Sequence, residues 1–364
     1  MKSVTCFINS LAGGGAEHQM VILANLLKEK GYDVSYITYN DSDDGVYKLR
    51  EDIKHIRIAC EGNRIKKLWK LNKFMLKYKT DCIISYRQPV NLILLTSMIF
   101  RKYVKVIVGE RSFTVGKPSL AERLNFNIFY NRADYIVPNS YTQTNYIVSK
   151  KPKFRNKTIT ICNYTEIDKY KPSPMPNGDV LRIGIFGRYS THKNYENLVE
   201  AVKLLVNAEV KNFEISWYGK STLANGEFCS DYVRFRNLVD DFGLSQFIKL
   251  NGLAKDVATM MDLFDVICLP SIFEGFSNSL SEAISCAKPI LASKISDNVV
   301  MVKENINGFL FNPNDPTDIA NAFHKMIDTS YEKRVDMASN SRKIAEDLFD
   351  KEHFVNSYIK LIES

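Results

Sequence analysis

The sequence predicts an α/β protein made of two doubly wound parallel sheets. Short apolar strands alternate with helices along most of the chain, which is typical of parallel sheets covered on both faces. Two such series each begin with a strand, a glycine-containing loop and a helix. At 364 residues the chain is also too long for one hydrophobic core, so we expect two domains.

The first series occupies residues 1–170. Val4–Asn9 is predicted to be a strand, Ser10–Gly15 a loop and Ala16–Lys30 a helix that Gly31 ends, with Val34–Tyr39 the next strand. Further expected elements are a helix at Arg64–Tyr78 and strands at Asp81–Ser85, Lys105–Val108 and Tyr135–Pro138.

The second series follows a linker. Tyr170–Asp179 holds three prolines and a glycine within a short polar stretch. We therefore place the second domain at 171–348. Its expected strands are Leu181–Phe186, Glu214–Tyr218, Ile248–Leu250, Val266–Leu269 and Pro289–Ala292, and its expected helices are Asn197–Val206, Tyr232–Phe242, Asp256–Phe264 and Ser277–Cys286. Ligands of such sheets bind beyond the carboxyl ends of the strands.

Two glutamates follow the Val266–Leu269 strand. Glu274 and Glu282 stand eight residues apart around a Gly/Ser/Asn stretch. Ser277 is a suitable N-cap, and the free amides of a helix beginning at about Asn278 favour a phosphate. Carboxylates accept hydrogen bonds from vicinal hydroxyls, which suits a sugar on one side and a ribose on the other. A surface charge and an ordinary first-turn glutamate would show the same local pattern.

The stretch GIFGRYSTHKN supplies Gly187, Arg188 and Lys193 at the end of a predicted strand. Two cations beside a glycine can clamp a diphosphate and neutralise the charge that develops on it. Taken alone, solvated loop charges are the simpler interpretation.

Three glycines, Gly13, Gly14 and Gly15, precede the first helix in SLAGGGAEHQM. A helix start of this kind can bind an anion or a sugar. It is not the dinucleotide fingerprint, because the third glycine would fall on His18, and it is not a P-loop, because no GK[ST] follows. A tight turn explains the glycines equally well.

Together these stretches resemble the retaining glycosyltransferases of family 4, and the match runs nearly end to end. It includes GGGAE, VPNS at Val137–Ser140, ICNYTEIDKYKP, GRYSTHKN, NGLAKDV, LPSIFEGFSNSLSEA and NGFLF at Asn307–Phe311. The ordered glutamate pair is the specific part of the match. The resemblance implies the GT-B fold, in which two Rossmann-like domains face a cleft. Residues 1–170 would then be the acceptor domain and 171–348 the nucleotide-sugar donor domain, with a helix at about 349–361 packed back on the first.

The resemblance also implies residue roles. Glu274 would contact the donor sugar, Glu282 the ribose, and Arg188 and Lys193 the leaving diphosphate. The expected catalytic residues are Glu274, Arg188 and Lys193; the expected donor-binding residues are Gly187, Asn194, Gly252, Leu253, Gly275, Phe276, Ser277, Asn278 and Glu282; and the expected acceptor or phosphate loop comprises Gly13, Gly14, Gly15, Glu110 and Arg111.

Two positions depart from the family pattern. Many members have a histidine in the first domain near the scissile bond, whereas this chain has VGERS, with Glu110 and Arg111. That version is similar to enzymes that build bacterial surface or glycoprotein oligosaccharides, and the roles of the two residues are open. Ala287 stands where a glycine is usual, and we attach no function to it.

The implied reaction is retaining transfer from a nucleotide sugar, expected to be a UDP-sugar. No residue stands out as a covalent nucleophile, so front-face attack by the acceptor is the preferred hypothesis. The resemblance also implies that no cofactor and no divalent metal are needed, which fits the five histidines that do not cluster and the absence of an HExxH motif.

The charge is polarised along the chain. Residues 1–170 hold 28 Lys and Arg against 15 Asp and Glu, whereas residues 171–364 hold 21 against 26. Asn63–Arg111 alone has 12 basic and 2 acidic residues, and each Lys or Arg near anionic lipid contributes about 1 kcal/mol. In the helix over Arg64–Lys79 we expect an apolar stripe with Ile65, Leu68, Trp69 and Leu76.

This charge fits an anionic, membrane-bound partner. We expect a nucleotide sugar, a glycan acceptor of the polyprenyl-diphosphate-linked type, and an anionic membrane surface as partners. Nucleic acid is not expected, because no RRM, KH or helix-turn-helix signature occurs. The expected location is cytoplasmic, peripheral at the inner face of the cytoplasmic membrane.

Three further features fit that location. The first ten residues lack the apolar region of a signal peptide. The longest apolar run, Val90–Phe100, is shorter than the roughly 20 residues of a membrane span. Seven scattered cysteines without a CxxC pair are expected to be free thiols.

Two other classes remain open from the sequence. A nicotinamide-dependent oxidoreductase with two Rossmann-like halves is supported by Asp41 alone and opposed by the broken glycine fingerprint. A non-catalytic sugar- or nucleotide-binding module is opposed by the presence of Glu274, Arg188 and Lys193 together.

Overall fold

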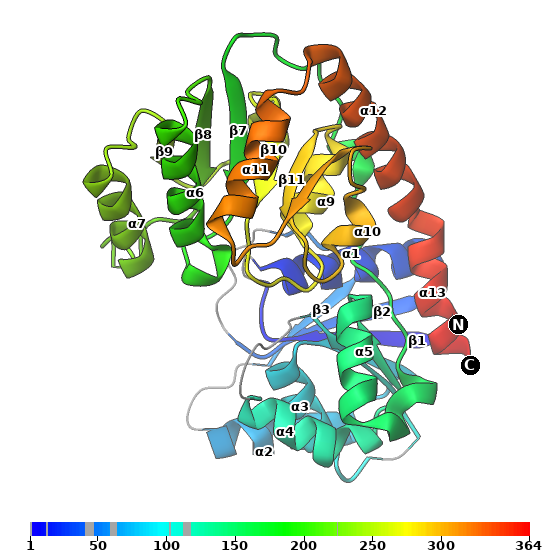
Figure 1. Cartoon of the computed structure of the whole chain (residues 1–364). Coiled ribbons are helices and arrows are strands. Elements are labelled where there is room, and N and C mark those ends of the chain that lie inside the picture. Colours follow the sequence, from blue (N-terminus) through cyan, green and yellow to red (C-terminus); the bar gives the residue numbers. More distant parts are fainter. Residues whose placement is uncertain are drawn as a thin grey trace. The chain divides into compact units, whose positions relative to one another are not determined.

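The computed structural model describes residues 2–11, 14–40, 47–58, 64–101, 103–111, 118–223 and 225–364. The chain forms two compact units (Figure 1). Unit 1 comprises Met1–Tyr164 with Lys351–Ser364, and unit 2 comprises Thr165–Asp350. Gly13, Asp41, Cys60 and the side chain of Ile65 lie outside the described residues.

Unit 1 contains a six-stranded parallel sheet in the order β3-β2-β1-β4-β5-β6. Its strands are β1 (Ser3–Ile8), β2 (Asp33–Thr38), β3 (Lys54–Arg57), β4 (Cys82–Tyr86), β5 (Lys105–Glu110) and β6 (Tyr135–Pro138). Its helices are α1 (Gly15–Glu29), α2 (Arg64–Lys77), α3 (Gln88–Ser97), α4 (Leu120–Asn127), α5 (Tyr141–Lys150) and α13 (Lys351–Glu363), with short 3₁₀ turns η1 (Phe129–Asn131) and η2 (Pro152–Lys157).

Unit 2 repeats this plan with the strand order β12-β11-β10-β7-β8-β9, again all parallel. Its strands are β7 (Leu181–Phe186), β8 (Phe213–Tyr218), β9 (Ile248–Asn251), β10 (Val266–Leu269), β11 (Ile290–Ser293) and β12 (Gly308–Phe311). Its helices are α6 (Tyr195–Asn207), α7 (Ser230–Asp241), α8 (Val257–Met261), α9 (Asn278–Ser285), α10 (Asn298–Met301), α11 (Pro316–Ile327) and α12 (Tyr331–Leu348), with turns η3 (Ile167–Lys169) and η4 (Thr191–Lys193). Both units are doubly wound sheets, as the sequence predicts.

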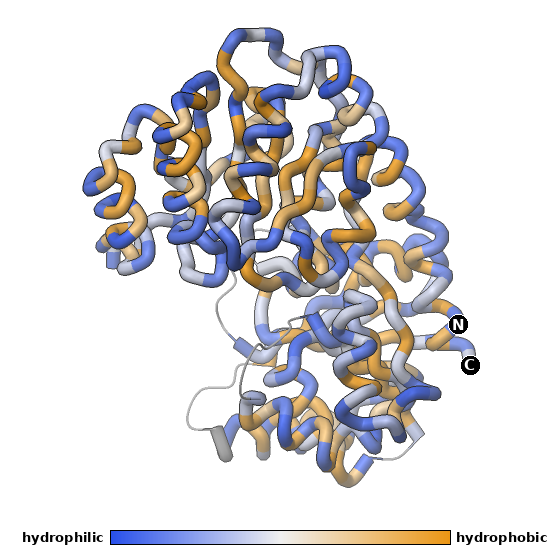
Figure 2. The backbone as a smooth tube through the Cα atoms, viewed as in Figure 1, coloured by the Kyte–Doolittle hydropathy of each residue, from blue (hydrophilic) through white to orange (hydrophobic). Residues whose placement is uncertain are grey.

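The central strands are buried along most of their length because helices cover both faces of each sheet. All residues of β4 and β10 are buried, and Figure 2 shows the strands of unit 2 coloured mainly as hydrophobic. Side-chain caps define several helix starts: Ser119, Ser140, Ser277 and Ser330 each accept a hydrogen bond from the amide three residues later. Each unit therefore has its own core.

Helix α13 belongs to unit 1, although it follows α12 of unit 2 in the chain. It packs against α1, and Tyr358 is fully buried. The Tyr86 hydroxyl donates to the Tyr358 hydroxyl at 2.8 Å. The last helix thus completes the core of unit 1.

The structure corrects one sequence expectation and shows where the longest apolar run lies. The apolar run Val90–Phe100 lies mostly in α3, where the buried Asn91 donates to the carbonyl of Gly109 at 3.0 Å. The predicted stripe on α2 is wrong for Trp69 and Leu76, which are 66% and 50% exposed. Leu71 and Met75, four residues apart, form its buried side instead.

None of the helices in the described part of the chain is long and apolar enough to cross a membrane.

Candidate functional site

The loops that follow β7 and β10 meet at the carboxyl edge of the unit 2 sheet. The two strands are paired neighbours, so their loops leave the sheet side by side. The amide of Ile272 donates to the carbonyl of His192 at 2.8 Å, and the rings of His192 and Phe273 stack with centroids 5.3 Å apart. These contacts fix the β7 loop against the β10 loop.

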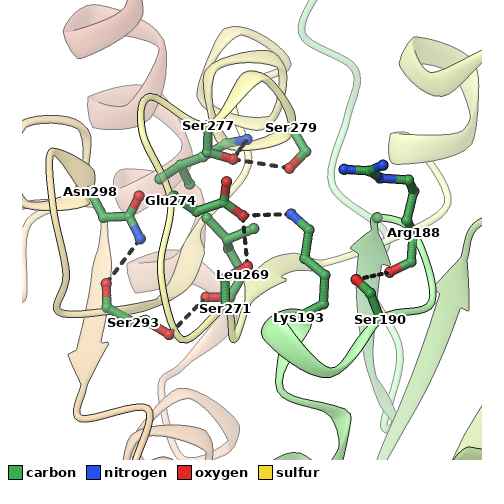
Figure 3. A network of polar contacts seen from close by, with 12 residues as sticks. Arg188, Ser190, Lys193, Leu269, Ser271, Glu274, Ser277, Ser279, Ser293 and Asn298 are labelled. Carbon is green, nitrogen blue, oxygen red and sulfur yellow. Dashed lines mark hydrogen bonds and ion pairs between the residues drawn. The ribbon is translucent and has the colours of Figure 1, made fainter. Parts of the chain in front are cut away.

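An ion pair joins the two loops (Figure 3). Lys193 Nζ lies 2.5 Å from Glu274 Oε1, and the side chains are 14% and 17% exposed. Ser271 Oγ donates to the same carboxylate oxygen at 2.8 Å. The pair holds both charges at the sheet edge. In Figure 3 no hydrogen bond is drawn to the second carboxylate oxygen of Glu274.

Arg188 is a second cation in the same loop. Its side chain is exposed, and its guanidinium group makes no contact with the residues drawn in Figure 3. Gly187 precedes it, and the Lys193 side chain passes 3.4 Å from the position that a Cβ of residue 187 would occupy. Lys193 therefore offers an anion a positive charge that is already paired with Glu274, and Arg188 offers one that is exposed to solvent.

Helix α9 begins beside this pair. Ser277 caps it by accepting from the amide of Leu280 at 3.3 Å, so the amides of the first turn that lack helix partners face the loop end. The carbonyl of Gly275 accepts from Ser296 Oγ at 3.0 Å. Phe276 is buried against Phe349, with ring centroids 6.2 Å apart. Asn278 is the first helical residue and is partly buried.

Glu282 lies one turn further along α9. The Tyr170 hydroxyl donates to its carboxylate, and burial raises the pKa of Glu282 to about 7 in spite of that bond. Arg342 donates to the carbonyls of Tyr170 at 2.8 Å and Ser285 at 2.7 Å. The segment around Tyr170 is therefore fastened to α9.

The remaining expected donor residues differ in what they can contact. Asn194 adopts a left-handed conformation (φ 67°) and its amide donates to the carbonyl of Pro313 at 2.7 Å, so it shapes the start of α6. Gly252 and Leu253 follow β9; Leu253 is 71% exposed, and the carbonyl of Gly252 accepts from the amide of Gly219 at 3.2 Å. Leu253 is thus open to a ligand, whereas the Asn194 side chain is occupied.

In unit 1 the glycine loop ends at α1. Gly14 is its N-cap, without a side-chain cap, and Gly15 begins the helix. A Cβ at Gly14 would lie 2.3 Å from Glu17 Oε2, so the Glu17 carboxylate lies close against the backbone of Gly14.

The Arg111 side chain makes its contacts within unit 1. Its guanidinium group lies 3.9 Å from the centroid of the Tyr86 ring and donates to Asn163 Oδ1 at 3.0 Å and to the Tyr358 hydroxyl. These contacts connect the end of β5 to α13. The side chain is held for packing, and its Nε has no partner among the described residues.

Glu110 is fully buried within a polar network. The Tyr130 hydroxyl donates to its Oε1, and burial raises the pKa of Glu110 to about 8, with the Glu122 charge adding to the rise. Glu110 Oε2 and Glu122 Oε2 both lack a hydrogen-bond partner among the described residues. Burial therefore favours the protonated form of Glu110.

Within the described residues, no group of three or more His, Cys, Asp and Glu side chains is placed to hold a metal ion.

Several contacts at the site were not foreseen from the sequence. Ser271 and His192 stand inside motifs that we singled out, but nothing in their spacing indicates their contacts. Tyr170 opens a stretch that we interpreted as a linker and also lies in the motif ICNYTEIDKYKP, but neither pattern indicates its bond to Glu282.

Comparison with known proteins decides the family. Residues 166–344 match the family model described as Glycosyl transferases group 1. The chain contains a group 1 glycosyltransferase domain. Because the match lies within unit 2, it covers both loops, the ion pair and α9. The oxidoreductase and binding-module alternatives are set aside by this finding.

Relatives extend the likeness over the whole chain. A Campylobacter jejuni enzyme named as a GalNAc-α-(1→4)-GalNAc-α-(1→3)-diNAcBac-PP-undecaprenol α-1,4-N-acetyl-D-galactosaminyltransferase is 23% identical over 100% of this chain and 98% of its own. An Escherichia coli UDP-Gal:α-D-GlcNAc-diphosphoundecaprenol α-1,3-galactosyltransferase is 27% identical over 47% of this chain and 46% of its own.

Solved structures define the fold. HepE of Anabaena, in complex with UDP and glucose, superposes with a TM-score of 0.82 at 19% identity, covering 100% of both chains. The likeness shows that the chain described here has the GT-B fold, as the sequence resemblance implies.

Proposed function

We propose that this glycosyltransferase moves a sugar from a UDP-sugar to a lipid-linked or polysaccharide glycan, with retention of the anomeric configuration and without a divalent metal. The observation that carries the proposal is the Lys193–Glu274 ion pair, set between uncommitted Arg188 and the start of α9. It places two cations, free helix amides and a carboxylate at one edge of one sheet, where ligands of parallel sheets bind.

The chemistry follows from charge. As the sugar–phosphate bond breaks, negative charge grows on the diphosphate, and fixed cations and helix amides stabilise it without reorganising. Arg188, Lys193 and the first turn of α9 would supply this charge in place of a metal ion. Glu274 would accept hydrogen bonds from the sugar hydroxyls. The acceptor oxygen would bond to the anomeric carbon on the face that the diphosphate leaves, and the hydroxyl proton would pass to the departing phosphate.

Glu282 would hold the ribose. Its carboxylate lies one helical turn beyond the α9 start, about 6 Å along the axis at 1.5 Å per residue. That separation suits a nucleotide whose diphosphate sits at the helix start. The base would lie toward Gly252 and Leu253, which follow β9 at the same carboxyl edge.

The acceptor class is supported by the relatives. The names of the C. jejuni and E. coli proteins both specify a diphosphoundecaprenol-linked glycan, and the HepE structure contains UDP. For this chain we infer an acceptor on a polyprenyl diphosphate, whose negative charge fits the excess of Lys and Arg in residues 1–170.

A membrane-facing surface would bring the enzyme to such an acceptor. Trp69, Phe100 and Tyr103 of unit 1 are 66%, 78% and 99% exposed. Asn72 of α2 donates to the carbonyl of Ser97 at 2.8 Å, so α2 and the end of α3, three residues before Phe100, are neighbours. Exposed aromatics among lysines are typical of the interface of an anionic bilayer. We place the enzyme at the cytoplasmic face of that membrane.

The test is a binding screen followed by a transfer assay. Purified protein is heated with UDP-, GDP-, ADP- and dTDP-sugars in EDTA, and a ligand at about 100 times its Kd should stabilise it by roughly 2.7 kcal/mol. The stabilising sugar nucleotide is then supplied with polyprenyl-diphosphate-linked glycans, and the anomeric configuration of the product is read by NMR. Stabilisation by none of the UDP-sugars, or activity only with added metal, would overturn the corresponding part of the proposal.

A further inference from the structure

Arg87 has a backbone conformation that side-chain-bearing residues rarely adopt. It stands between β4 and α3 with φ 81° and ψ 137°. Glycine would occupy this conformation freely, whereas a Cβ makes it strained. Strain of this kind persists only where the surroundings enforce it and often marks a functional position.

The surroundings of Arg87 enforce the conformation through the main chain. Its amide donates to the carbonyl of Gly109 at 3.0 Å, and its carbonyl accepts from the amide of Asn91 at 2.8 Å. A Cβ at Gly109 would lie 2.2 Å from the Tyr86 ring, so β4 and β5 are in close contact at this end. Backbone packing therefore sets φ at residue 87, and it does not require an arginine there.

The side chain of Arg87 is anchored through one nitrogen. Nη1 lies 2.8 Å from Glu17 Oε1 and 3.5 Å from Asn9 Oδ1. Glu17 is buried, with its other carboxylate oxygen against Gly14. The Arg87 side chain is 43% exposed, and its Nε and Nη2 have no hydrogen-bond partner among the described residues. The free edge of the guanidinium fork is thus held beside the glycine loop.

We propose that Arg87 binds a phosphoryl group of a substrate in unit 1. This inference rests on the proposed function, since that function supplies the phosphorylated substrates. A guanidinium fork matches the oxygens of a phosphate in a bidentate way that a lysine cannot. Arg87 also stands at the carboxyl end of β4, the edge of the sheet where ligands bind. The phosphoryl group is either the diphosphate of the donor or that of the lipid-linked acceptor.

The test compares Arg87→Gly and Arg87→Lys with a matched control, Arg50→Gly. Arg50 is 42% exposed and ion-paired to Asp52 in the same unit. Calorimetry gives the affinity for UDP, kinetics gives the KM for the lipid-linked acceptor, and thermal unfolding gives the Tm. Arg87→Gly relieves the backbone strain but leaves the buried Glu17 carboxylate without its ion-pair partner, so the binding of each variant is measured well below its own Tm.

We expect Arg87→Gly to weaken one phosphorylated ligand at least tenfold, Arg87→Lys to weaken it less, and Arg50→Gly to leave it unchanged. A loss of UDP affinity assigns the group to the donor, and a raised acceptor KM with unchanged UDP affinity assigns it to the acceptor. Unchanged values for both in Arg87→Gly, or an equal loss in Arg50→Gly, would overturn the inference. A wild-type protein that neither binds a nucleotide nor transfers a sugar would instead refute the proposed function.

Discussion

Lys193 and Glu274 form an ion pair between the loops that follow two neighbouring strands, with Nζ and Oε1 2.5 Å apart. Ser271 supports the carboxylate at 2.8 Å. Because both side chains are mostly shielded from water, the pair is already ordered before a ligand arrives. An ordered cation needs little reorganisation when negative charge develops next to it.

The first prediction concerns Lys193. Replacing it by methionine keeps the aliphatic stem beside Gly187 and removes the charge. We expect kcat to fall by about 10²–10³, the usual cost of removing one preorganised electrostatic contact. The measurement is the rate of sugar transfer at saturating donor. Lys211→Met serves as the control, because Lys211 pairs with Glu209 on the surface of the same unit; equal losses in both variants would contradict the assignment.

The second prediction concerns the pH dependence of UDP binding. Burial raises the pKa of Glu282 to about 7, and a carboxylate accepts hydrogen bonds from ribose hydroxyls best when it is ionised. We therefore expect the Kd to be about tenfold higher at pH 6 than at pH 8, by calorimetry. Tyr170→Phe removes the hydroxyl that lowers this pKa, so the midpoint should move to higher pH. Any pH dependence of the Kd that remains in Glu282→Gln belongs to the ligand phosphate. If Glu282→Gln shows the same pH dependence of the Kd as the wild type, Glu282 is not the titrating group.

The third prediction concerns stability. Glu110 has an ordinary pKa of 4.5 and a folded-state pKa of about 8. The folded state therefore holds the proton more tightly, so the stabilising contribution is complete below pH 4.5 and is lost as the pH rises to about 8. The slope is at most about 1.4 kcal/mol per pH unit.

Glu110→Gln should remove that slope, since glutamine stays neutral and its carbonyl can still accept from Tyr130. Urea unfolding at pH 5.5 and 8.5 measures the effect. The variant should gain stability over the wild type as the pH rises. Parallel curves for the two proteins would mean that Glu110 does not titrate in this window.

The fourth prediction settles what Arg111 does. A lysine cannot both cover the Tyr86 ring and reach Asn163 and Tyr358, so Arg111→Lys should lower the free energy of unfolding by roughly 2 kcal/mol. Transfer activity measured well below the Tm should be largely retained. Arg50→Lys, an exposed position, should change neither quantity. Lost activity in a variant of wild-type stability would give Arg111 a direct role with the substrate instead.

Periodicity predicted most of the fold because parallel strands are apolar throughout. The strands at Tyr135–Pro138, Leu181–Phe186 and Val266–Leu269 have the expected bounds. β3 (Lys54–Arg57) was missed because its residues KHIR are polar and lie at the sheet edge. α3 was not assigned because four apolar residues follow one another in its middle while polar residues such as Asn91 are buried, which hides the period of a helix.

The site was less accessible to sequence reasoning. The motifs placed Lys193 and Glu274 at the ends of adjacent strands, but nothing in their sequence separation of 81 residues indicates that they bind each other. Arg87 was not singled out at all, because a strained φ leaves no trace in the sequence when the residue is not glycine. Tertiary packing determines both features.

The last prediction concerns the exposed face of α2, where periodicity placed Trp69 inside. Trp69 is exposed because Leu71 and Met75 occupy the buried side, and Lys73 Nζ lies 5.3 Å from the centroid of its ring. We expect the wild type to bind anionic vesicles and Trp69→Ser with Phe100→Ser to bind them at least tenfold more weakly in sedimentation. The exposed Leu253→Ser is the control, because it lies in unit 2. Since lysines contribute through charge, high salt should weaken the wild type as well. Binding that is insensitive to both the aromatic changes and salt would place the membrane contact elsewhere.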